Sequence, residues 1–213
     1  MSIETFKSAP KDCTNCDLHL GRSQVVYSDV FRNSEDDLTV IVIGEAPGAK
    51  EDEQGKPFVG ASGKILRKEL QKLPGRIVIT NTVKCRPPEN RNPKASEKSA
   101  CNGFLQMELE YYKPDLILLI GRISSSLYLD AKTLKSFSNI SGSLFNDKYI
   151  PILHPASTMY NGKKNKPIWE ASWENVAKII ADKFKTAPIA PNTNSTKAKN
   201  GKKVASLDQF MKD

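Results

Sequence analysis

The chain has 213 residues, 38% of them hydrophobic, and a formal net charge of +8. This length suits one domain of average size with room for a tail. The longest apolar runs, such as residues 116–120, are far shorter than a membrane span needs, so we expect an intracellular, cytoplasmic protein with no membrane partner. The basic charge favours polyanionic partners, because each neutralised phosphate releases condensed counterions.

Four runs rich in β-branched and other apolar residues predict buried strands, over residues 38–44, 76–83, 115–121 and 149–153. Helical patterns are expected over residues 62–73, 96–112, from about 124 onward and over 167–184. Loops are expected over residues 45–60 and over 87–93, where three prolines break any regular element. Strands that alternate with helices predict a three-layer α/β/α fold around a central, mainly parallel, four-stranded sheet.

The composition of the chain changes at Thr186. Residues 186–203 are polar and basic with almost nothing to bury, which predicts a disordered linker after a folded domain over residues 1–185. Beyond the linker, residues 204–213 carry Leu207, Phe210 and Met211, whose spacing forms the apolar face of a single helical turn. Such a peptide either packs back on the domain or binds a partner.

Polar residues follow three of the four predicted strands at the point where each strand ends. The first strand runs into Gly44 and Glu45, the second into Asn81, and the fourth into His154. The carboxyl ends of parallel strands meet at one edge of a sheet, where ligands gather beside helix N-termini. We therefore expect these side chains to form one site.

The four cysteines are Cys13, Cys16, Cys85 and Cys101. In an intracellular protein we expect metal ligands or buried free thiols rather than structural disulfides. Four thiolates suit either a tetrahedral zinc ion or a 4Fe–4S cluster, and their spacing does not choose between the two. His19 lies near the first pair and is expected to be structural or exposed.

Three segments resemble the signatures of family 4 uracil-DNA glycosylases. They are GEAPGAKEDEQGKPFVGASG over residues 44–63, NTVKCRPPENRNP over 81–93 and HPA over 154–156, and the Cys13 and Cys16 pair precedes them as in that family. The resemblance implies a uracil-DNA glycosylase fold and an enzyme that flips uracil out of DNA and hydrolyses its N-glycosidic bond. It also favours a 4Fe–4S cluster over zinc, bound by all four cysteines. We expect a monomer that acts on uracil-containing DNA in the nucleoid.

The resemblance implies that Gly44, Phe58 and Asn81 hold the flipped base. Phe58 would stack on the base, and Asn81 would read the uracil edge, because one carboxamide offers both a donor and an acceptor. His154 would donate a hydrogen bond to a uracil carbonyl as negative charge builds on the departing base. A core phenylalanine, a turn asparagine and a structural histidine are the respective alternatives.

The group that aligns the attacking water has several candidates. The resemblance favours Glu45, whose carboxylate would also stabilise an oxocarbenium-like sugar. Asn90 would share in holding the water, with a plain turn asparagine as the alternative. Glu51 and Asp52 lie in the same loop as Glu45, and the sequence does not exclude them.

In the glycosylase superfamily the loop after the histidine enters the duplex and fills the space left by the flipped base. The candidate DNA contacts in this chain are Arg86, Arg91, Met159, Tyr160, Lys163 and Lys164, with Met159 or Tyr160 as the wedge. A solvated, lysine-rich loop is the alternative for residues 157–164.

Residues 204–213 resemble the peptide by which repair enzymes bind the DNA sliding clamp. Leu207, Phe210 and Met211 match its apolar positions, and Val204 stands where glutamine is usual. A flexible tether that presents such a peptide would raise the effective concentration of the enzyme at replicating DNA.

Two other functions are weighed against a glycosylase. The first is an inactive, glycosylase-fold DNA-binding subunit of a replication complex, and the presence of Glu45, Phe58, Asn81 and His154 argues against it. The second is an iron–sulfur electron carrier, which would be small and acidic rather than basic.

Overall fold

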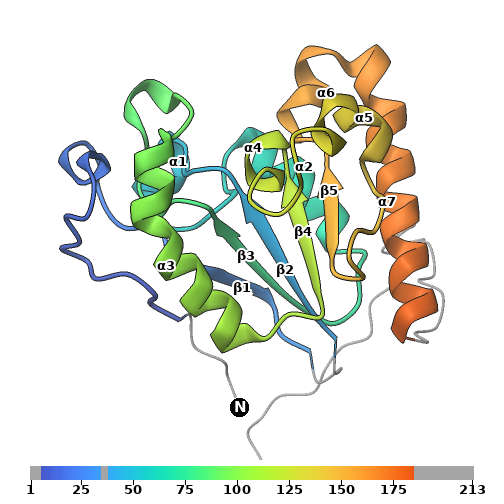
Figure 1. The fold of residues 1–213 in the computed structure, drawn as a ribbon, viewed down its shortest axis with the longest axis horizontal. Coiled ribbons are helices and arrows are strands. Elements are labelled where there is room, and N and C mark those ends of the chain that lie inside the picture. Colours follow the sequence, from blue (N-terminus) through green and yellow to red (C-terminus); the bar gives the residue numbers. More distant parts are fainter. Residues whose placement is uncertain (1–5, 35–37, 185–213) are drawn as a thin grey trace, which may run out of the picture.

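The computed structural model describes residues 6–34 and 38–184, which form three layers with a sheet in the middle (Figure 1). Five strands make up the sheet of the described residues, in the order β1-β3-β2-β4-β5. They are β1 (Asp29–Arg32), β2 (Thr39–Gly44), β3 (Arg76–Asn81), β4 (Leu116–Ile120) and β5 (Tyr149–Ile152). The three-layer α/β/α fold expected from the sequence is confirmed.

The edge strand β1 is the main difference from the predicted sheet, which had four strands. β2, β3, β4 and β5 run parallel to one another, whereas β1 pairs with β3 in the antiparallel direction. All four β1 residues, from Asp29 to Arg32, are only partly buried, as suits an edge. Two of the four are charged, so this strand lacks the apolar run that marks a central one.

Ten helical segments connect and cover the strands in the part of the chain that the structure describes. They are η1 (Asp17–Leu20), α1 (Ala49–Gln54), α2 (Ala61–Leu70), η2 (Pro88–Asn90), α3 (Ala95–Tyr112), α4 (Arg122–Ser125), η3 (Thr133–Ser136), α5 (Phe137–Ile140), α6 (Ala156–Tyr160) and α7 (Gly162–Phe184). Two differences from the sequence prediction bear on the site. The expected loop over residues 45–60 contains α1, and the closing helix α7 begins at Gly162, with Pro167 inside it.

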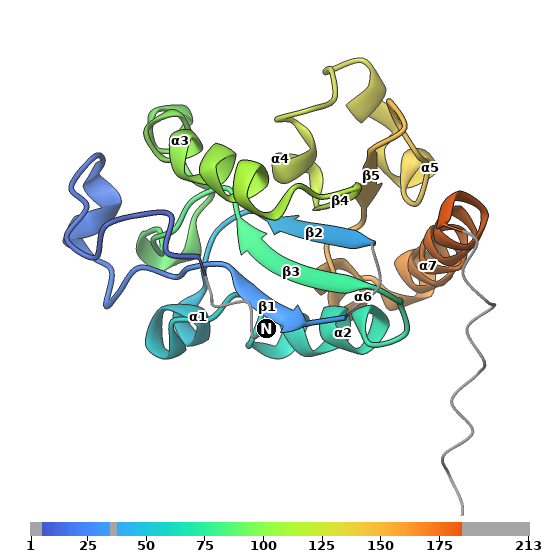
Figure 2. The same cartoon turned by 90° about the horizontal axis from the view of Figure 1, so that it is seen from below.

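Alternate residues of the central strands face two separate hydrophobic cores. Val40 and Val42 of β2 face α2 and α7, and α7 contributes Trp169 and Trp173 to this core. The alternate residues Ile41 and Ile43 face α3 on the other side of the sheet. Figure 2 shows α3 on one side of the sheet and α2 and α7 on the other. Burial on both faces explains why these strands read as continuous apolar runs.

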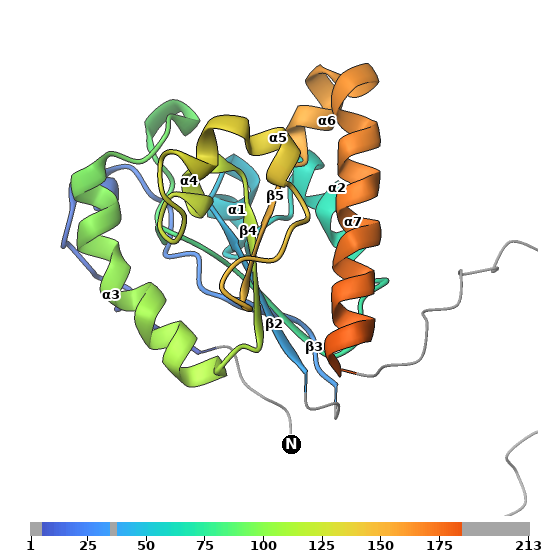
Figure 3. The same cartoon turned by 45° about the vertical axis from the view of Figure 1, so that its right-hand side comes forward.

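The two long helices α3 and α7 stand on opposite flanks, and the carboxyl ends of the parallel strands lie at the edge where α1, α4 and α6 begin (Figure 3). Residues that follow β2, β3, β4 and β5 therefore meet at one edge. A search of the described helices finds none with the length and apolar character needed to span a bilayer.

Candidate active site

Gly44 brings together two of the residues expected to hold the base. It ends β2 and pairs in register with Asn81, which ends β3. A Cβ atom built on Gly44 would lie 2.4 Å from Asn81 Oδ1 and 2.5 Å from Phe58 Cε2. Such distances leave no room for a side chain at residue 44. The glycine therefore allows the Phe58 ring and the Asn81 amide to close over one point of the backbone.

The backbone of Phe58 is held in an unusual conformation by its surroundings. Its φ angle is +53°, in the left-handed region that a residue with a bulky side chain rarely adopts. Arg67 donates from Nε to the Phe58 carbonyl at 2.9 Å and from Nη2 to the Pro57 carbonyl at 2.7 Å. A Cβ atom on Gly63 would lie 2.1 Å from the same Phe58 carbonyl oxygen. The packing thus fixes the aromatic wall, and no pattern in the sequence pointed to the part that Arg67 plays.

His154 follows β5 and lies opposite this wall. The centroids of its ring and of the Phe58 ring are 6.3 Å apart, with the planes tilted by 35°. The backbone N–H of Ala156 lies 3.3 Å from His154 Nδ1, which serves as the acceptor. In the neutral ring the proton then sits on Nε2, which is left to donate. Burial lowers the pKa of His154 and so favours this neutral form.

Glu45 follows Gly44 directly and is partly buried. Its backbone carbonyl accepts hydrogen bonds from Thr82 Oγ1 at 2.5 Å and from the Val83 amide at 3.3 Å, so the chains after β2 and β3 stay joined. Burial raises the pKa of the Glu45 carboxyl, and the positive charge of Lys98 opposes that rise. A carboxylate in such a setting is suited to attract a proton or a positive charge.

Glu51 and Asp52 are engaged in holding loops. Glu51 accepts hydrogen bonds from the amides of Gly48 at 3.2 Å, Val59 at 2.9 Å and Gly60 at 2.8 Å, which closes the segment that carries Phe58. Asp52 is 3% exposed, and both of its oxygens accept from the Ser23 amide, at 3.0 and 2.9 Å. Among the three candidate carboxylates Glu45, Glu51 and Asp52, all within the described residues, Glu45 alone accepts no hydrogen bond from a backbone amide in this structure.

Asn90 and the two arginines near it lie in the turn after Cys85, where Asn90 is exposed and both arginines are partly buried. Asn90 has a φ angle of +55°, and its Oδ1 accepts from Arg86 Nε at 2.9 Å. Arg91 makes a two-pronged ion pair with Glu97, at 2.6 and 2.8 Å. The structure thus gives Asn90 and Arg91 partners outside the group formed by Gly44, Phe58, Asn81 and His154. The DNA and water contacts assigned to this turn stay predictions.

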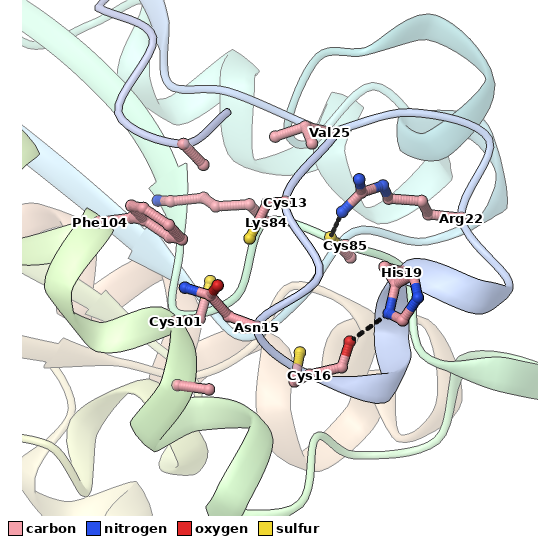
Figure 4. Close-up of a pocket in the computed structure, with 12 residues that line it drawn as sticks. Cys13, Asn15, Cys16, His19, Arg22, Val25, Lys84, Cys85, Cys101 and Phe104 are labelled. Atoms are coloured by element: carbon pink, nitrogen blue, oxygen red, sulfur yellow. Dashed lines mark hydrogen bonds between the residues drawn. The ribbon is translucent and has the colours of Figure 1, made fainter. Parts of the chain in front are cut away.

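The four cysteines come from three separate parts of the chain and line one pocket. Their sulfur atoms point toward one another (Figure 4), from the segment before η1, the turn after β3 and helix α3. Within residues 6–34 and 38–184, no three His, Cys, Asp or Glu side chains close around a single point that would hold one metal ion. His19 lines the same pocket, and its Nδ1 forms a hydrogen bond with the Cys16 carbonyl at 2.8 Å.

Positive charge lies close to these thiols. Arg22 donates from Nη1 to Cys85 Sγ at 3.1 Å and from Nη2 to the Lys11 carbonyl at 2.7 Å. Burial raises the pKa of the Cys101 thiol to about 11, and it raises the pKa of Cys85, where Arg22 opposes the rise. Thiols that burial keeps protonated ionise when a cation binds them, since the charge of the bound ion reverses the effect.

The residues predicted to enter the duplex lie on helices rather than in a loop, because residues 156–160 form α6 and Gly162 begins α7. The side chains of Met159 and Tyr160 are 51% and 88% exposed, at the end of α6. Lys163 and Lys164 are exposed in the first turn of α7. The linker over 186–203 and the proposed clamp-binding residues Val204, Leu207, Phe210 and Met211 lie outside the described residues.

Comparison with known proteins adds a family to this geometry. Residues 31–177 match the family model described as the uracil DNA glycosylase superfamily. A type-4 uracil-DNA glycosylase from Sulfurisphaera tokodaii is 33% identical over 198 residues, which are 86% of this chain and 82% of the relative. That from Thermotoga maritima is 36% identical over 166 residues, 75% of this chain and 84% of the relative. That from Archaeoglobus fulgidus is 31% identical over 197 residues, 87% of this chain and 96% of the relative.

Proposed function

The chain belongs to the type-4 uracil-DNA glycosylases, and on that basis we propose that it removes uracil from DNA by hydrolysing the N-glycosidic bond. The observation that carries the proposal is the closure of the Phe58 ring and the Asn81 amide over Gly44, with His154 opposite. An aromatic wall beside one carboxamide suits a flat base with an imide edge.

Base recognition is assigned to Phe58 and Asn81. Phe58 stacks on the flipped uracil, and Asn81 pairs with the uracil edge, accepting from N3–H and donating to O4. Cytosine presents the opposite pattern at these two atoms, so a fixed Asn81 discriminates against it. The buried setting of Asn81, which is 3% exposed, supports this role because it leaves the amide few orientations.

His154 is assigned to the charge that leaves with the base. When the C1′–N1 bond breaks, its electron pair stays on the uracil ring and places negative charge on O2 and O4. A neutral His154 donates from Nε2 to uracil O2 and stabilises this charge as it develops. The hydrogen bond that Ala156 donates to Nδ1 and the burial that lowers the His154 pKa both support that protonation state.

Glu45 is assigned to the sugar and the water. Its carboxylate stabilises the positive charge that forms on C1′ and O4′ and orients a water molecule toward C1′. The water oxygen bonds to C1′ and one water proton passes to the carboxylate, which leaves an abasic site and the uracil anion. The uracil anion takes up a proton from solvent and Glu45 releases its proton to solvent, which completes the hydrolysis. The engagement of Glu51 and Asp52 in loop contacts supports Glu45 over its neighbours.

The activity is tested by incubating the protein with a uracil-containing oligonucleotide and scoring abasic sites by alkaline cleavage. Release of free uracil, with none from the matched cytosine oligonucleotide, is expected. The Asn81→Asp variant is assayed in parallel. It should lose most of the activity, because a carboxylate cannot donate a hydrogen bond to uracil O4. A wild-type protein that binds the oligonucleotide and leaves it intact would favour the inactive DNA-binding subunit instead.

The cysteine pocket is proposed to hold a 4Fe–4S cluster, with Cys13, Cys16, Cys85 and Cys101 as its ligands. Four thiols from three parts of the chain that face one pocket suit a metal centre with four thiolate ligands, and the likeness to the type-4 enzymes favours the cluster over one zinc ion. Arg22 supports the assignment, because its guanidinium donates to Cys85 Sγ and would neutralise part of the negative charge of four thiolates. When bound, the cluster supplies cross-links that tie the N-terminal segment to β3 and α3.

Iron and sulfide analysis together with a visible spectrum test the cluster. About four irons per chain and a broad absorption near about 400 nm are expected for thiolate-ligated iron. A colourless preparation with one zinc per chain would contradict the cluster and leave the glycosylase assignment standing.

The exposed C-terminal end of α6 and the adjoining first turn of α7 are proposed to contact DNA. Tyr160 and Met159 offer apolar surface that would fill the gap left by the flipped base, and Lys163 and Lys164 would neutralise phosphates. Arg86, in the turn after Cys85, is also proposed to neutralise a phosphate. Arg91 could do so only after its ion pair with Glu97 breaks.

The last ten residues are proposed to bind the DNA sliding clamp through Val204, Leu207, Phe210 and Met211. Support comes from the sequence alone, in which an apolar turn follows a polar linker. Deleting residues 203–213 should abolish binding to the clamp and leave uracil release from naked DNA unchanged. Clamp binding by the truncated chain would end this assignment.

A further inference from the structure

Lys84 is a charged side chain buried within the fold, at 1% exposure. Its ammonium group donates to Thr80 Oγ1 at 2.7 Å, to the Asn81 carbonyl at 3.0 Å and to Glu108 Oε2 at 2.7 Å. A lysine ammonium has three protons, so each of them has a partner. The side chain therefore turns back on its own strand end and closes the turn between residues 81 and 84.

Glu108 completes the network from α3 and is itself 0% exposed. Its Oε1 accepts from Ser8 Oγ at 2.8 Å, and its Oε2 accepts from Thr80 Oγ1 at 2.7 Å as well as from Lys84. Three separate parts of the chain, the N-terminal segment, β3 and α3, thus meet at one ion pair. A fully buried pair of this kind is poor at raising stability, because taking both charges out of water is costly. A role in fixing a geometry explains its presence better.

The position of Lys84 shows which geometry it fixes. The residue after Lys84 is Cys85, a member of the cysteine pocket, and Lys84 itself also lines that pocket (Figure 4). The tip of the side chain holds the carbonyl of Asn81, whose own amide lies against the same point of Gly44 as the Phe58 ring. Lys84 therefore links the end of β3 that faces the base to the turn that carries a cysteine.

We propose that Lys84 is a positioning residue: it holds the Asn81 peptide so that the Asn81 side chain faces the uracil edge, and Glu108 holds Lys84 in turn. This inference rests on the proposed function, since it assumes that Asn81 reads uracil. Without the hydrogen bond from Lys84, the Asn81–Thr82 peptide keeps the bond that the Thr82 amide donates to the Gly44 carbonyl at 3.0 Å but loses the one at the Asn81 carbonyl. The Asn81 side chain can then shift, and a displacement of about 1 Å in such a group costs on the order of 100-fold in rate. DNA backbone binding does not use this hydrogen bond and stays unchanged.

The test compares variants that lack Lys84 without leaving an unpaired buried charge. They are Lys84→Met/Glu108→Gln and Lys84→Met/Glu108→Leu, and the matched control is Lys72→Met/Glu69→Gln, which removes an ion pair with an exposed lysine at the end of α2. The measurements are the single-turnover rate of uracil release and the Kd for DNA that carries an abasic site.

We expect both Lys84 double variants to release uracil about 10- to 100-fold more slowly, with Kd for abasic DNA within about twofold of wild type. Free uracil should inhibit them at least about tenfold more weakly, a change that general loosening of the fold would not confine to the base. The Lys72 control should stay within about threefold of the wild-type rate. Wild-type release and wild-type uracil inhibition by a folded Lys84 double variant would overturn the inference.

Lys84→Arg covers the case in which neither double variant folds. It keeps a positive charge opposite Glu108, but a planar guanidinium does not place three donors as an ammonium does. We expect release at least about threefold slower than wild type, and a wild-type rate in this variant would then overturn the inference. An inactive wild-type protein would instead refute the proposed function, and with it the role of Lys84.

Discussion

The base pocket and the cysteine pocket are neighbours along the chain, where Asn81 belongs to the first and Cys85 to the second, yet they are built in different ways. Gly44, Phe58 and Asn81 are fixed by the sheet register and by backbone hydrogen bonds with Arg67 and Glu51. The four cysteines come from three segments, which are joined by Arg22 at Cys85 and by the buried network of Lys84 and Glu108 rather than by strand pairing. The first site is shaped by the sheet, whereas in the second the proposed cluster would add direct cross-links between the segments.

The largest expected effect falls on the base pocket alone. His154→Leu removes the donor from the developing uracil anion and should lower kcat by about 100- to 1,000-fold, the usual range for one such donor. Single-turnover kinetics on a uracil oligonucleotide measure the change. The visible spectrum should match that of wild type, and a changed spectrum would show that the two pockets are less separate than their construction suggests.

Gly44→Ala tests the shape of the base pocket without removing any functional group. The added Cβ would meet Asn81 Oδ1 at 2.4 Å and the Phe58 ring at 2.5 Å, so one of the two must move. We expect kcat/KM to fall by about 100-fold, as for a misplacement of about 1 Å. The matched control is Gly103→Ala on α3, where nothing lies within 4 Å of the added atom. Equal activity of the two variants would refute the tight closure over residue 44.

Cys101→Ser tests whether the cysteine pocket serves stability rather than catalysis. It removes one proposed ligand from the cysteine pocket, and we expect the midpoint of thermal unfolding to fall by about 10 °C, which corresponds to about 3 kcal/mol for a domain of this size. Uracil release by the folded fraction at 25 °C should fall less than tenfold. Differential scanning calorimetry and the release assay measure the two effects. A large loss of activity with an unchanged unfolding midpoint would show that the cysteine pocket serves catalysis rather than stability.

The acid limb of the rate profile tests Glu45. Water activation needs the ionised carboxylate, and burial raises its pKa above the ordinary value of 4.5, so the rate should fall as the pH drops through a value higher than 4.5. The His154 pKa is lowered by burial, so His154 stays neutral over the upper part of this range. Glu45→Gln should be slower and should lack this limb. A limb that survives the substitution assigns it to another group.

The smallest effect concerns DNA binding at α7. The double variant Lys163→Ala/Lys164→Ala should reduce the slope of log Kd against log salt by about 0.9 for each phosphate that the variant no longer neutralises. Lys135→Ala/Lys178→Ala removes the same charge from other exposed positions and serves as the control. Identical slopes for the two double variants would show that charge alone, rather than the position of Lys163 and Lys164, attracts DNA.

The sequence predicted the central strands and the residues at their ends, because buried parallel strands leave continuous apolar runs and a site at their ends leaves polar interruptions. It missed β1, whose charged residues suit an edge. It also missed the helical course of residues 156–164, because the resemblance to the superfamily and the run of polar residues indicated a loop there. The supporting side chains Arg67, Glu51 and Lys84 were missed for a general reason: a lone charged residue on a helix or loop carries no sign of the backbone group it will meet.

The three hydrogen bonds that Glu51 accepts order the segment that carries Phe58 when the protein folds, rather than when DNA binds. Backbone amides that point at one carboxylate form an anion-binding nest, and here the chain fills the nest with its own side chain. The segment that carries Phe58 is therefore closed before any DNA arrives, and the free energy of ordering it belongs to folding. Binding energy from the duplex remains for the step that no part of the fold performs in advance, the extraction of the base from its stack.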